Sequence, residues 1–348
     1  MTDAKAQTQS AMAREIAEIP AAAERLLQRV DRFAEIAERI RLAQPRMVVF
    51  CGRGSSGHAG VYLRYLCEAW LGLLVSAAAP SVVTAYRRPP NMRGALFVVI
   101  SQSGRSPDLV TATEVARKSG ALTLAIVNDE TSPAAAASEL VLPIGAGEEH
   151  AVAATKTVVL SMIAGARLVS ALAGDEQLND SLQRMPHRLS EALTCDWKDW
   201  AERTAAAPAA FVVGRGYGLG PVREIALKVT EIFRVPALGY SAAELRHGPR
   251  ASVTSATPVL VLRQNDEAAR AIDELVQDLQ QDLQDDVAPS IFTVGGPAGM
   301  LPWIGDGHPA CDPVLMLVPA YRAIEAAARR RGFDPDRPPH LSKVTRTL

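Results

Sequence analysis

A run of hydroxyl and amide side chains lies between an apolar segment and the start of a helix. Residues 96–100 are uninterrupted and apolar, which predicts a strand buried on both faces of a parallel sheet. Ser106 fits an N-cap and Pro107 fits the first helical position. Free backbone N–H groups and the helix dipole make such a turn an anion site. We therefore predict a phosphate-binding loop, with an ordinary capped loop as the alternative. Its side-chain donors are Ser101, Gln102, Ser103 and Ser106.

A glycine-rich turn follows an earlier apolar run. Gly52, Gly54 and Gly57 have the G-x-G-x-x-G spacing that is typical of dinucleotide-binding domains. The segment that should then supply a carboxylate for a ribose reads VVTAYRR and contains none. Nicotinamide binding remains an alternative. We favour a second wall of the phosphate site, with Ser55 or Ser56 as a donor.

Glu224, Lys228 and Glu231 are spaced i, i+4 and i+7, so they share one stripe of a predicted helix. Spacing alone favours a solvated face with a Glu–Lys pair. The helix begins, however, at a glycine-rich turn like the one described above, so the stripe could instead face a cleft. A partly desolvated carboxylate beside a lysine would there be a general base that moves a proton off carbon.

Two further residues, His247 and Lys343, each have two interpretations, one of which is a role in acid–base or amine chemistry. His247 precedes Gly-Pro at a predicted helix end, where a histidine is either a capping or core group or an acid–base near neutral pH. Lys343 lies in the tail after two prolines and is either solvent-exposed or close to the cleft. In the cleft its amine could pair with phosphate or form an imine with a carbonyl.

Strand-like and helical patterns alternate over the first half, which predicts a doubly wound α/β domain. Residues 12–41 predict one or two helices on the outside of that domain, and residues 151–173 predict a long helix. Residues 175–198 have helical spacing and connect the halves. The predicted strands are 47–51, 74–75, 82–83, 96–100, 122–127 and 140–144.

The start of the first sheet recurs later in the chain. FVVGRG at residues 211–216 repeats the apolar run and glycine turn at 48–54, which predicts two similar α/β domains in tandem with a ligand cleft between them. Later predicted strands are 259–262, 291–294 and 315–318, with an amphipathic helix at 267–283. The predicted boundaries are 1–45 for an N-terminal helical segment, 46–174 for the first domain, 175–205 for a helical connection and 206–348 for the second domain.

Composition argues against several other classes of protein. The net charge is −1 and 48% of the residues are hydrophobic, so nucleic-acid binding is not expected. Four distant cysteines and six histidines lack metal-ligand spacing, which predicts a reduced cytoplasmic protein without a metal site. The first ten residues are polar, and charged residues interrupt the long apolar stretches. We therefore expect neither a secretory signal nor a membrane span.

Six motifs in order resemble the sugar isomerase (SIS) family with two tandem SIS domains. They are GRGSS, SQSGRS, AGEEHAVAATK, EIALKVTEI, AELRHGP and HLSKVT. The chain is similar to the isomerase half of glucosamine-6-phosphate synthase over nearly its whole length, and more closely to SIS-type glucosamine-6-phosphate deaminases. The resemblance implies two mostly parallel sheets flanked by helices, a phosphorylated amino sugar as ligand and no cofactor.

The resemblance also assigns roles to residues. It implies that Ser55 or Ser56 and the 101–106 loop bind phosphate, and that Glu231 shuttles a proton between C1 and C2, with Glu224 and Lys228 beside it. His247 matches the ring-opening histidine, which the neighbouring subunit of a homodimer contributes. Lys343 matches the tail lysine that contacts or condenses with the open-chain sugar. The backbone of Val152 matches a sugar-facing position, whereas Ala154 and Thr230 replace a serine and a lysine of the synthase.

The expected reaction converts glucosamine 6-phosphate to fructose 6-phosphate and ammonia. Phosphosugar isomerisation without deamination, ammonia-dependent glucosamine-6-phosphate synthesis and a non-catalytic sugar-phosphate sensor are the alternatives. Glutamine-dependent synthesis is not expected, because no glutaminase segment precedes Met12 in this sequence. The presence of Glu231, His247 and Lys343 favours an enzyme over a sensor.

Overall fold

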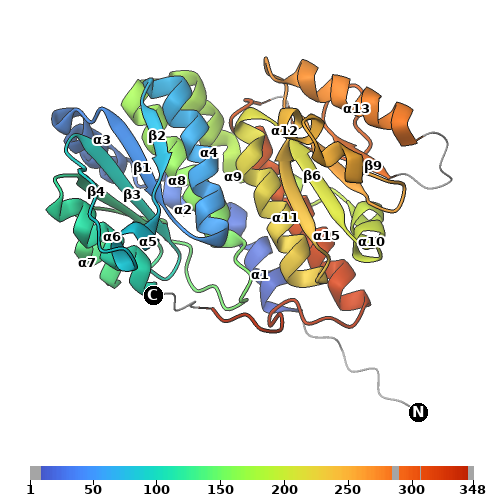
Figure 1. Ribbon diagram of the computed structural model, residues 1–348, viewed down its shortest axis with the longest axis horizontal. Coiled ribbons are helices and arrows are strands. Elements are labelled where there is room, and N and C mark those ends of the chain that lie inside the picture. Colours follow the sequence, from blue (N-terminus) through green and yellow to red (C-terminus); the bar gives the residue numbers. More distant parts are fainter. Residues whose placement is uncertain (1–8, 284–289, 306, 344–348) are drawn as a thin grey trace, which may run out of the picture.

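The first half of the chain forms a five-stranded parallel sheet (Figure 1). The computed structural model describes residues 9–283, 290–305 and 307–343. The strand order is β2-β1-β3-β4-β5, and every residue of the central strand β3 is buried, as its apolar run predicted. The strands are β1 (Met47–Cys51), β2 (Leu74–Ala77), β3 (Ala95–Ser101), β4 (Leu122–Val127) and β5 (Leu140–Pro143).

Helices cover both faces of this sheet. Alternate side chains of each strand point to opposite faces, so two apolar layers form. Val49, Phe97 and Val99 pack against α6 and α7, whereas Val48 and Val98 belong to a core cluster with α4 and α8. The helices are α4 (Gly54–Leu71), α5 (Pro80–Thr84), α6 (Pro107–Lys118), α7 (Pro133–Ala137) and α8 (Lys156–Ala173).

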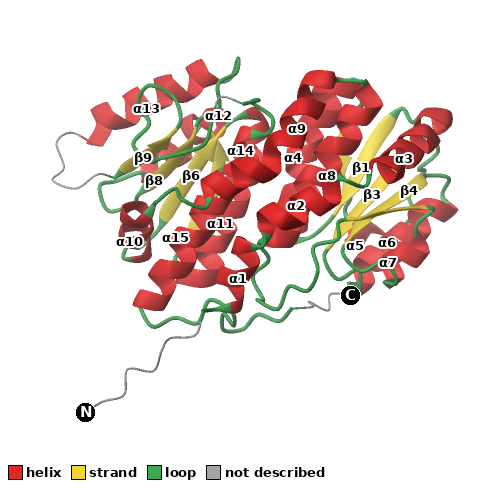
Figure 2. Ribbon diagram, turned by 180° about the vertical axis from the view of Figure 1, so that it is seen from behind, coloured by secondary structure: helices red, strands yellow, loops and turns green. Residues whose placement is uncertain are grey.

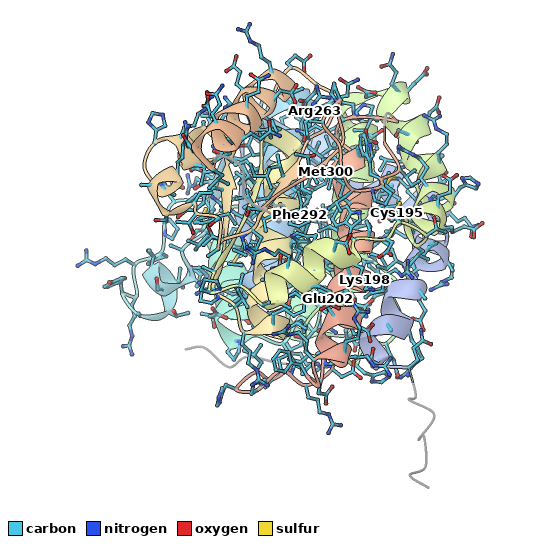
Figure 3. The ribbon with its side chains drawn as sticks, turned by 90° about the vertical axis from the view of Figure 1, so that its right-hand side faces the viewer. Cys195, Lys198, Glu202, Arg263, Phe292 and Met300 are labelled. Atoms are coloured by element: carbon cyan, nitrogen blue, oxygen red, sulfur yellow. The ribbon has the colours of Figure 1, made fainter. Side chains whose placement is uncertain are left out.

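The second half contains a four-stranded parallel sheet with the order β7-β6-β8-β9. The repeated apolar runs form β1 and β6, which occupy equivalent places and each lead into a helix. Figure 3 shows the outer end of this half and labels Glu202 of α10. This residue forms an ion pair with Arg330 of α15. The elements are β6 (Ala210–Gly214), α11 (Leu219–Phe233), β7 (Ala237–Ser241), α12 (Ala242–Arg246), β8 (Val259–Leu262), α13 (Ala269–Leu283), β9 (Ile291–Val294), α14 (Asp312–Leu315) and α15 (Leu317–Arg330), with α10 (Lys198–Ala205) before them.

A layer of helices between the sheets joins the two halves, as Figure 2 shows from behind. One apolar core cluster runs through α2 (Ile19–Leu27), α4, α8, α9 (Glu176–Ala192), α11 and α15 and reaches the inner face of both sheets. Helix α11 approaches α4 closely at Gly220, where an added Cβ would lie 2.6 Å from the Tyr62 side chain and 2.7 Å from the His58 carbonyl. The halves therefore share their core.

The N-terminal segment forms three helices rather than the one or two predicted. They are α1 (Ala11–Ala17), α2 (Ile19–Leu27) and α3 (Val30–Ala43), followed much later by α9 (Glu176–Ala192). Helix α1 packs against α15 of the second half, and Ser10 donates a hydrogen bond to Glu325 at 2.6 Å. The prediction that this segment packs on the outside of the first domain holds for α3, which contacts α8 and β5. It is wrong for α1 and α2, which contact α15 and α9 and lie in the layer between the sheets.

Two short apolar runs predicted as strands are helical. Residues 82–83 lie in α5, which Pro80 opens, and residues 315–318 span the end of α14 and the start of α15. Short apolar runs do not separate a buried strand from a buried helix. The helix predicted from residue 151 starts at Lys156, because the Glu149 carboxylate accepts the backbone N–H groups of Thr155 and Thr157 at 3.1 and 3.0 Å. Strand β7 was not predicted.

Among the described residues one helix, α8, is long and apolar enough to cross a membrane, but 78% of it is buried inside the protein. It serves here as a core helix.

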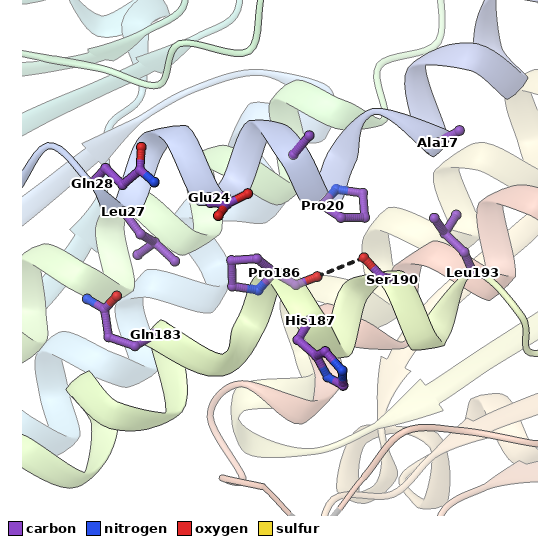
Figure 4. Close-up of a pocket in the computed structure, with 11 residues that line it drawn as sticks. Ala17, Pro20, Glu24, Leu27, Gln28, Gln183, Pro186, His187, Ser190 and Leu193 are labelled. Atoms are coloured by element: carbon purple, nitrogen blue, oxygen red, sulfur yellow. Dashed lines mark hydrogen bonds between the residues drawn. The ribbon is translucent and has the colours of Figure 1, made fainter.

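A hollow of about 680 Å³ lies between α2 and α9, and none of the predicted site residues line it (Figure 4). Helix α9 contains Pro186, whose carbonyl accepts a hydrogen bond from Ser190 at 3.1 Å.

Candidate active site

A cavity of about 500 Å³ lies where the loops after β1 and β3 meet α11, the 152–154 loop and the C-terminal tail. Nine of the predicted site residues line it: Ser55, Ser56, Ser101, Gln102, Ser103, Ser106, Val152, Glu231 and Lys343. Glu224 and Lys228 lie beside Glu231 without lining the cavity, and His247 does not line it. The two halves of the chain thus meet at one polar site.

The serine loop keeps its shape through its own hydrogen bonds. Ser101 accepts the N–H of Gly104 at 3.0 Å, and Ser103 accepts that of Arg105 at 3.3 Å. Gly104 has φ +62° and packs so closely on Ser132 that an added Cβ would lie 2.1 Å from its Oγ. Ser106 occupies the N-cap of α6, yet its side chain makes no capping bond. Its hydroxyl is available to a ligand instead.

The glycine turn after β1 requires its glycines for reasons internal to the turn. An added Cβ on Gly52 would lie 3.0 Å from the backbone of Ser56, and one on Gly57 would lie 3.3 Å from the Gly52 carbonyl. Gly54 has φ +50°, which favours glycine. The fingerprint spacing therefore follows from local geometry without requiring a dinucleotide.

The two serines of this turn have different environments. Ser55 donates to Glu224 Oε1 at 3.0 Å and accepts from Lys228 Nζ at 3.1 Å, so its hydroxyl is committed to α11. Ser56 lines the cavity, and its side-chain hydroxyl has no hydrogen-bond partner among the residues that the structure describes. The hydroxyl that is available in the cavity is therefore the one on Ser56.

Helix α11 presents its charged stripe to the interior. Glu224 and Lys228 are fully buried and the Glu231 side chain is 20% exposed, so the solvated face that spacing favoured is wrong. Lys228 Nζ lies 3.4 Å from Glu224 and also pairs with Glu231. Tyr321 donates to Glu224 at 3.2 Å, and His58 Nδ1 lies 3.0 Å from the same carboxylate. One lysine thus links the carboxylate in the cavity to the one behind it.

Burial and pairing act in opposite directions on this cluster. Burial alone would raise the pKa of Glu224, but Lys228, His58 and Ser55 more than offset it, so the pKa lies below its ordinary value. Burial would lower the pKa of Lys228, but Glu224 and Glu231 raise it above its ordinary value. The pKa of Tyr321 is raised by burial and then by Glu224, so the phenol stays protonated and donates. The pair is therefore charged at neutral pH.

Acidification should destabilise the protein partly through Glu224. A carboxyl whose pKa is lower in the folded state contributes stability above its unfolded pKa of about 4.3, and this stability is lost as the pH falls through the folded value. We expect the free energy of unfolding in urea to fall more steeply below about pH 4.3 for the wild type than for Glu224→Gln. Equal slopes from pH 7 to 3 would contradict the assignment.

The described part of the C-terminal tail runs from the second half beneath the first, as Figure 1 shows in red. The Val152 N–H donates to the Asp336 carbonyl at 3.0 Å, which ties the tail to the 152–154 loop. Lys343 Nζ lies 3.1 Å from Glu149 and 2.6 Å from the Ala151 carbonyl, and its side chain is 26% exposed. The tail lysine therefore reaches the cavity, which its place in the sequence left open. Val344 and Thr345 lie outside the described residues.

His247 lies on the surface, at the C-terminal end of α12. Its turn is anchored to α13, because Arg246 pairs with Asp278 and Arg250 contacts Asp282 at 2.7 Å. The histidine is thus neither a core group nor a member of this chain's cavity. Its predicted position across a subunit interface stays a prediction.

Sequence reasoning did not find four residues near the cavity. His58 and Tyr321 bind Glu224, and the buried Glu149 holds Lys343. Arg53 lines the cavity and pairs with the buried Asp108 at 3.1 Å. Only Arg53 carried a sequence signal, as a cation within the glycine turn. The other three enter through contacts between segments that are 97 to 194 residues apart.

Two parallel sheets with a polar cavity at the carboxyl ends of the first define an α/β protein that binds its ligand at the ends of its strands. A family model described as the SIS domain matches residues 41–171. A crystal structure of a candidate phosphosugar isomerase from Silicibacter pomeroyi DSS-3 is 37% identical, with a TM-score of 0.87, and the match covers 94% of this chain and 100% of that one. The chain belongs to the SIS-domain family of phosphosugar isomerases.

Longer enzymes are also related to the chain. The glutamine–fructose-6-phosphate aminotransferase of Pseudomonas aeruginosa is 31% identical over 328 residues, which are 89% of this chain and 52% of that enzyme. The chain spans about half the length of the curated relatives it matches. The glucosamine-6-phosphate deaminase of Thermotoga maritima has the same fold, with a TM-score of 0.77 and 23% identity over 97% of this chain and 100% of that one.

Proposed function

We propose that this phosphosugar isomerase converts glucosamine 6-phosphate to fructose 6-phosphate and ammonia. The observation that carries the proposal is that Glu231, from the second half, lines the same cavity as the serine loop of the first. A sugar whose phosphate is bound by one wall can then present its first carbons to a carboxylate on the other. The names of the aminotransferase and deaminase relatives support an amino sugar as substrate.

In this proposal the phosphate binds at the start of α6. Backbone N–H groups at a helix N-terminus carry a positive partial charge and bind anions. Ser101, Gln102 and Ser103 surround that end, and the Ser106 hydroxyl is not used for capping. From the first turn we assign Ser56 as the donor, since Ser55 is already bonded to Glu224 and Lys228.

Glu231 is the proposed general base. It removes the C2 proton of the open-chain aminoaldose. The C–H electron pair forms the C1=C2 bond of an enolamine, while the carbonyl pair moves to O1, which takes up a proton. The same carboxyl returns the proton to C1 while the amine loses one N–H proton and the C2=N bond forms, which gives fructosimine. Water then adds to C2, and the nitrogen leaves as ammonia while the carbonyl forms. Lys228 pairs with Glu231 and, through Glu224, ties this base to the buried cluster.

His247 and Lys343 act at the other end of the sugar in this proposal. His247 opens the pyranose and comes from a second copy of the chain, since it lies exposed on an anchored turn. Lys343 contacts the open-chain sugar from the tail, with Val152 offering its backbone nearby. A homodimer and a cytoplasmic location accompany the proposal as predictions.

Two other outcomes are compatible with the family. A phosphosugar isomerase without deamination would use the same Glu231 proton transfer, and ammonia-dependent synthesis would be the reverse reaction. A sensor would bind the sugar without turnover, but the buried charges behind Glu231 serve no evident purpose in simple binding. The pairing of a carboxylate with Lys228 inside the protein favours catalysis.

The test is incubation of the protein with glucosamine 6-phosphate while ammonia and fructose 6-phosphate are measured together. We expect both products in equal amounts. If the protein interconverts a phosphorylated aldose and ketose but releases no ammonia from any amino sugar, the proposal is wrong and the protein is a phosphosugar isomerase without deaminase activity. Binding of glucosamine 6-phosphate in calorimetry without either product would support the sensor. The reverse reaction with fructose 6-phosphate and ammonium measures the synthetic direction.

A further inference from the structure

We infer that Arg53 is the cation that neutralises the phosphate of the substrate, and that the buried Asp108 holds it in place. The inference deepens the proposed function and rests on its placement of a phosphate at the serine loop. It adds a charged group to a subsite that is otherwise built from neutral donors. Neither residue belongs to the set that sequence reasoning assigned to the site.

The geometry of Arg53 leaves part of its guanidinium available to a ligand. Its Nε and Nη2 both lie 3.1 Å from Asp108 Oδ2. Nη1 has no partner among the residues that the structure describes. The side chain lines the cavity and is 56% exposed, whereas the Asp108 side chain is only 2% exposed. The arginine is thus fixed on one edge and open on the other.

Asp108 is itself held firmly. It lies in the first turn of α6, directly after Pro107, where the helix dipole favours a carboxylate. Its Oδ1 accepts the Leu109 N–H at 2.9 Å, and its Oδ2 accepts from Arg53. A buried carboxylate with two such contacts positions a guanidinium at the same helix end that is proposed to bind the phosphate.

The other nearby cations have partners that draw them away from this position. Of the described residues that line the cavity, two are cationic, Arg53 and Lys343. Lys343 donates to Glu149 and to the Ala151 carbonyl. Arg105 belongs to the serine loop but does not line the cavity, and it pairs with the exposed Asp129 at 2.7 Å. Arg53 is therefore the cation that is free to face a phosphate.

A phosphate ester carries close to two negative charges at neutral pH, so hydroxyl and amide donors leave its charge uncompensated. Hydrogen bonds from an arginine to phosphate are about twice as strong as neutral ones and are often bidentate. Asp108 restricts the guanidinium before the ligand arrives, which reduces the entropy lost on binding. The competing view is that the pair only ties the glycine turn to α6.

The experiment compares Arg53→Gln with the wild type in two assays. We expect KM for glucosamine 6-phosphate to rise about 10- to 100-fold, with kcat changed less than about threefold, because a charge-assisted contact to a non-reacting group is lost. The dissociation constant of inorganic phosphate, measured by calorimetry, should rise by a similar factor. Arg53→Lys should recover part of the affinity for both glucosamine 6-phosphate and inorganic phosphate, since lysine restores the positive charge but not the planar, bidentate geometry of the guanidinium.

Arg64→Gln is the matched control. Arg64 also lies at 56% side-chain exposure and pairs with a carboxylate, Glu68, at 3.0 Å, but it lies outside the cavity. The Arg64→Gln variant should bind inorganic phosphate with the same affinity as the wild type. A folded Arg53→Gln variant with unchanged phosphate affinity would overturn the inference and leave only the structural tie. Binding of inorganic phosphate tests the role of Arg53 even if the protein does not turn over glucosamine 6-phosphate. Failure of this inference can therefore be distinguished from failure of the proposed function.

Discussion

The Glu231→Gln variant is expected to lose between about 10²- and 10⁴-fold in kcat while it still binds glucosamine 6-phosphate. The amide keeps the size of the side chain but cannot accept the C2 proton. Glu231 is 20% exposed and lies at the cavity wall, so the exchange removes no core packing. Ammonia release under saturating substrate gives kcat, and exchange of the C2 proton with deuterated water reports the first step directly.

Glu114→Gln is the control for this variant. Glu114 is an exposed carboxylate on α6 that does not line the cavity, and its loss should leave kcat unchanged. Both variants should unfold at the temperature of the wild type within a few degrees. If Glu231→Gln retained more than a tenth of the wild-type kcat, another group would have to be the base.

The same variant tests the place of His247. If the histidine enters a neighbouring subunit, then mixing Glu231→Gln with His247→Ala creates hybrid dimers in which one of the two sites is complete. Random reassociation of symmetric dimers should then restore about a quarter of the wild-type activity. No recovery in mixtures that demonstrably exchange subunits would place His247 outside the reaction.

Lys228→Met should produce the largest loss of stability, about 3–5 kcal/mol in the free energy of unfolding. The substitution keeps the length of the side chain but leaves Glu224 buried with no lysine beside it. Ser55, His58 and Tyr321 would still bond the carboxylate, but they do not replace the charge. Urea unfolding at pH 7 measures the effect.

Lys156→Met is the matched control for that variant. Lys156 is equally buried, but its partner Glu18 is 57% exposed and can be hydrated when the lysine is lost. We expect a clearly smaller loss. Adding Glu224→Gln to Lys228→Met should recover part of the stability, because the uncompensated buried charge disappears. A Lys228→Met variant within about 1 kcal/mol of the wild type would show that the cluster is not held by its charges.

The sequence predicted the central parts of the fold better than its edges. Strand β3 is buried on both faces, so its apolar run is continuous and recognisable. Strand β7 reads ALGYS and is an edge strand of intermediate exposure, so it carries no such run. Residues 315–318 are apolar because α14 and α15 are buried on nearly all sides. A short apolar run in such a helix cannot be told from the apolar run of a buried strand.

The site shows where pattern reasoning ends. Spacing placed Glu224, Lys228 and Glu231 on one stripe, but it could not tell which way that stripe faces. The direction is set by the close packing of α11 on α4 at Gly220, a contact between distant segments. His58 and Tyr321 reach Glu224 through the same packing, so no local sequence motif predicts these contacts.

The helical layer between the sheets also determines how this protein could be recombined with its relatives. Helices that originate in both halves fill a single apolar interior, so a crossover at residues 175–205 would pair surfaces that never adapted to one another. A chimaera that exchanges α4, α8, α9, α11 and α15 as a set would preserve those surfaces. New specificities are more safely grafted onto the loops around the cavity than assembled from separate halves.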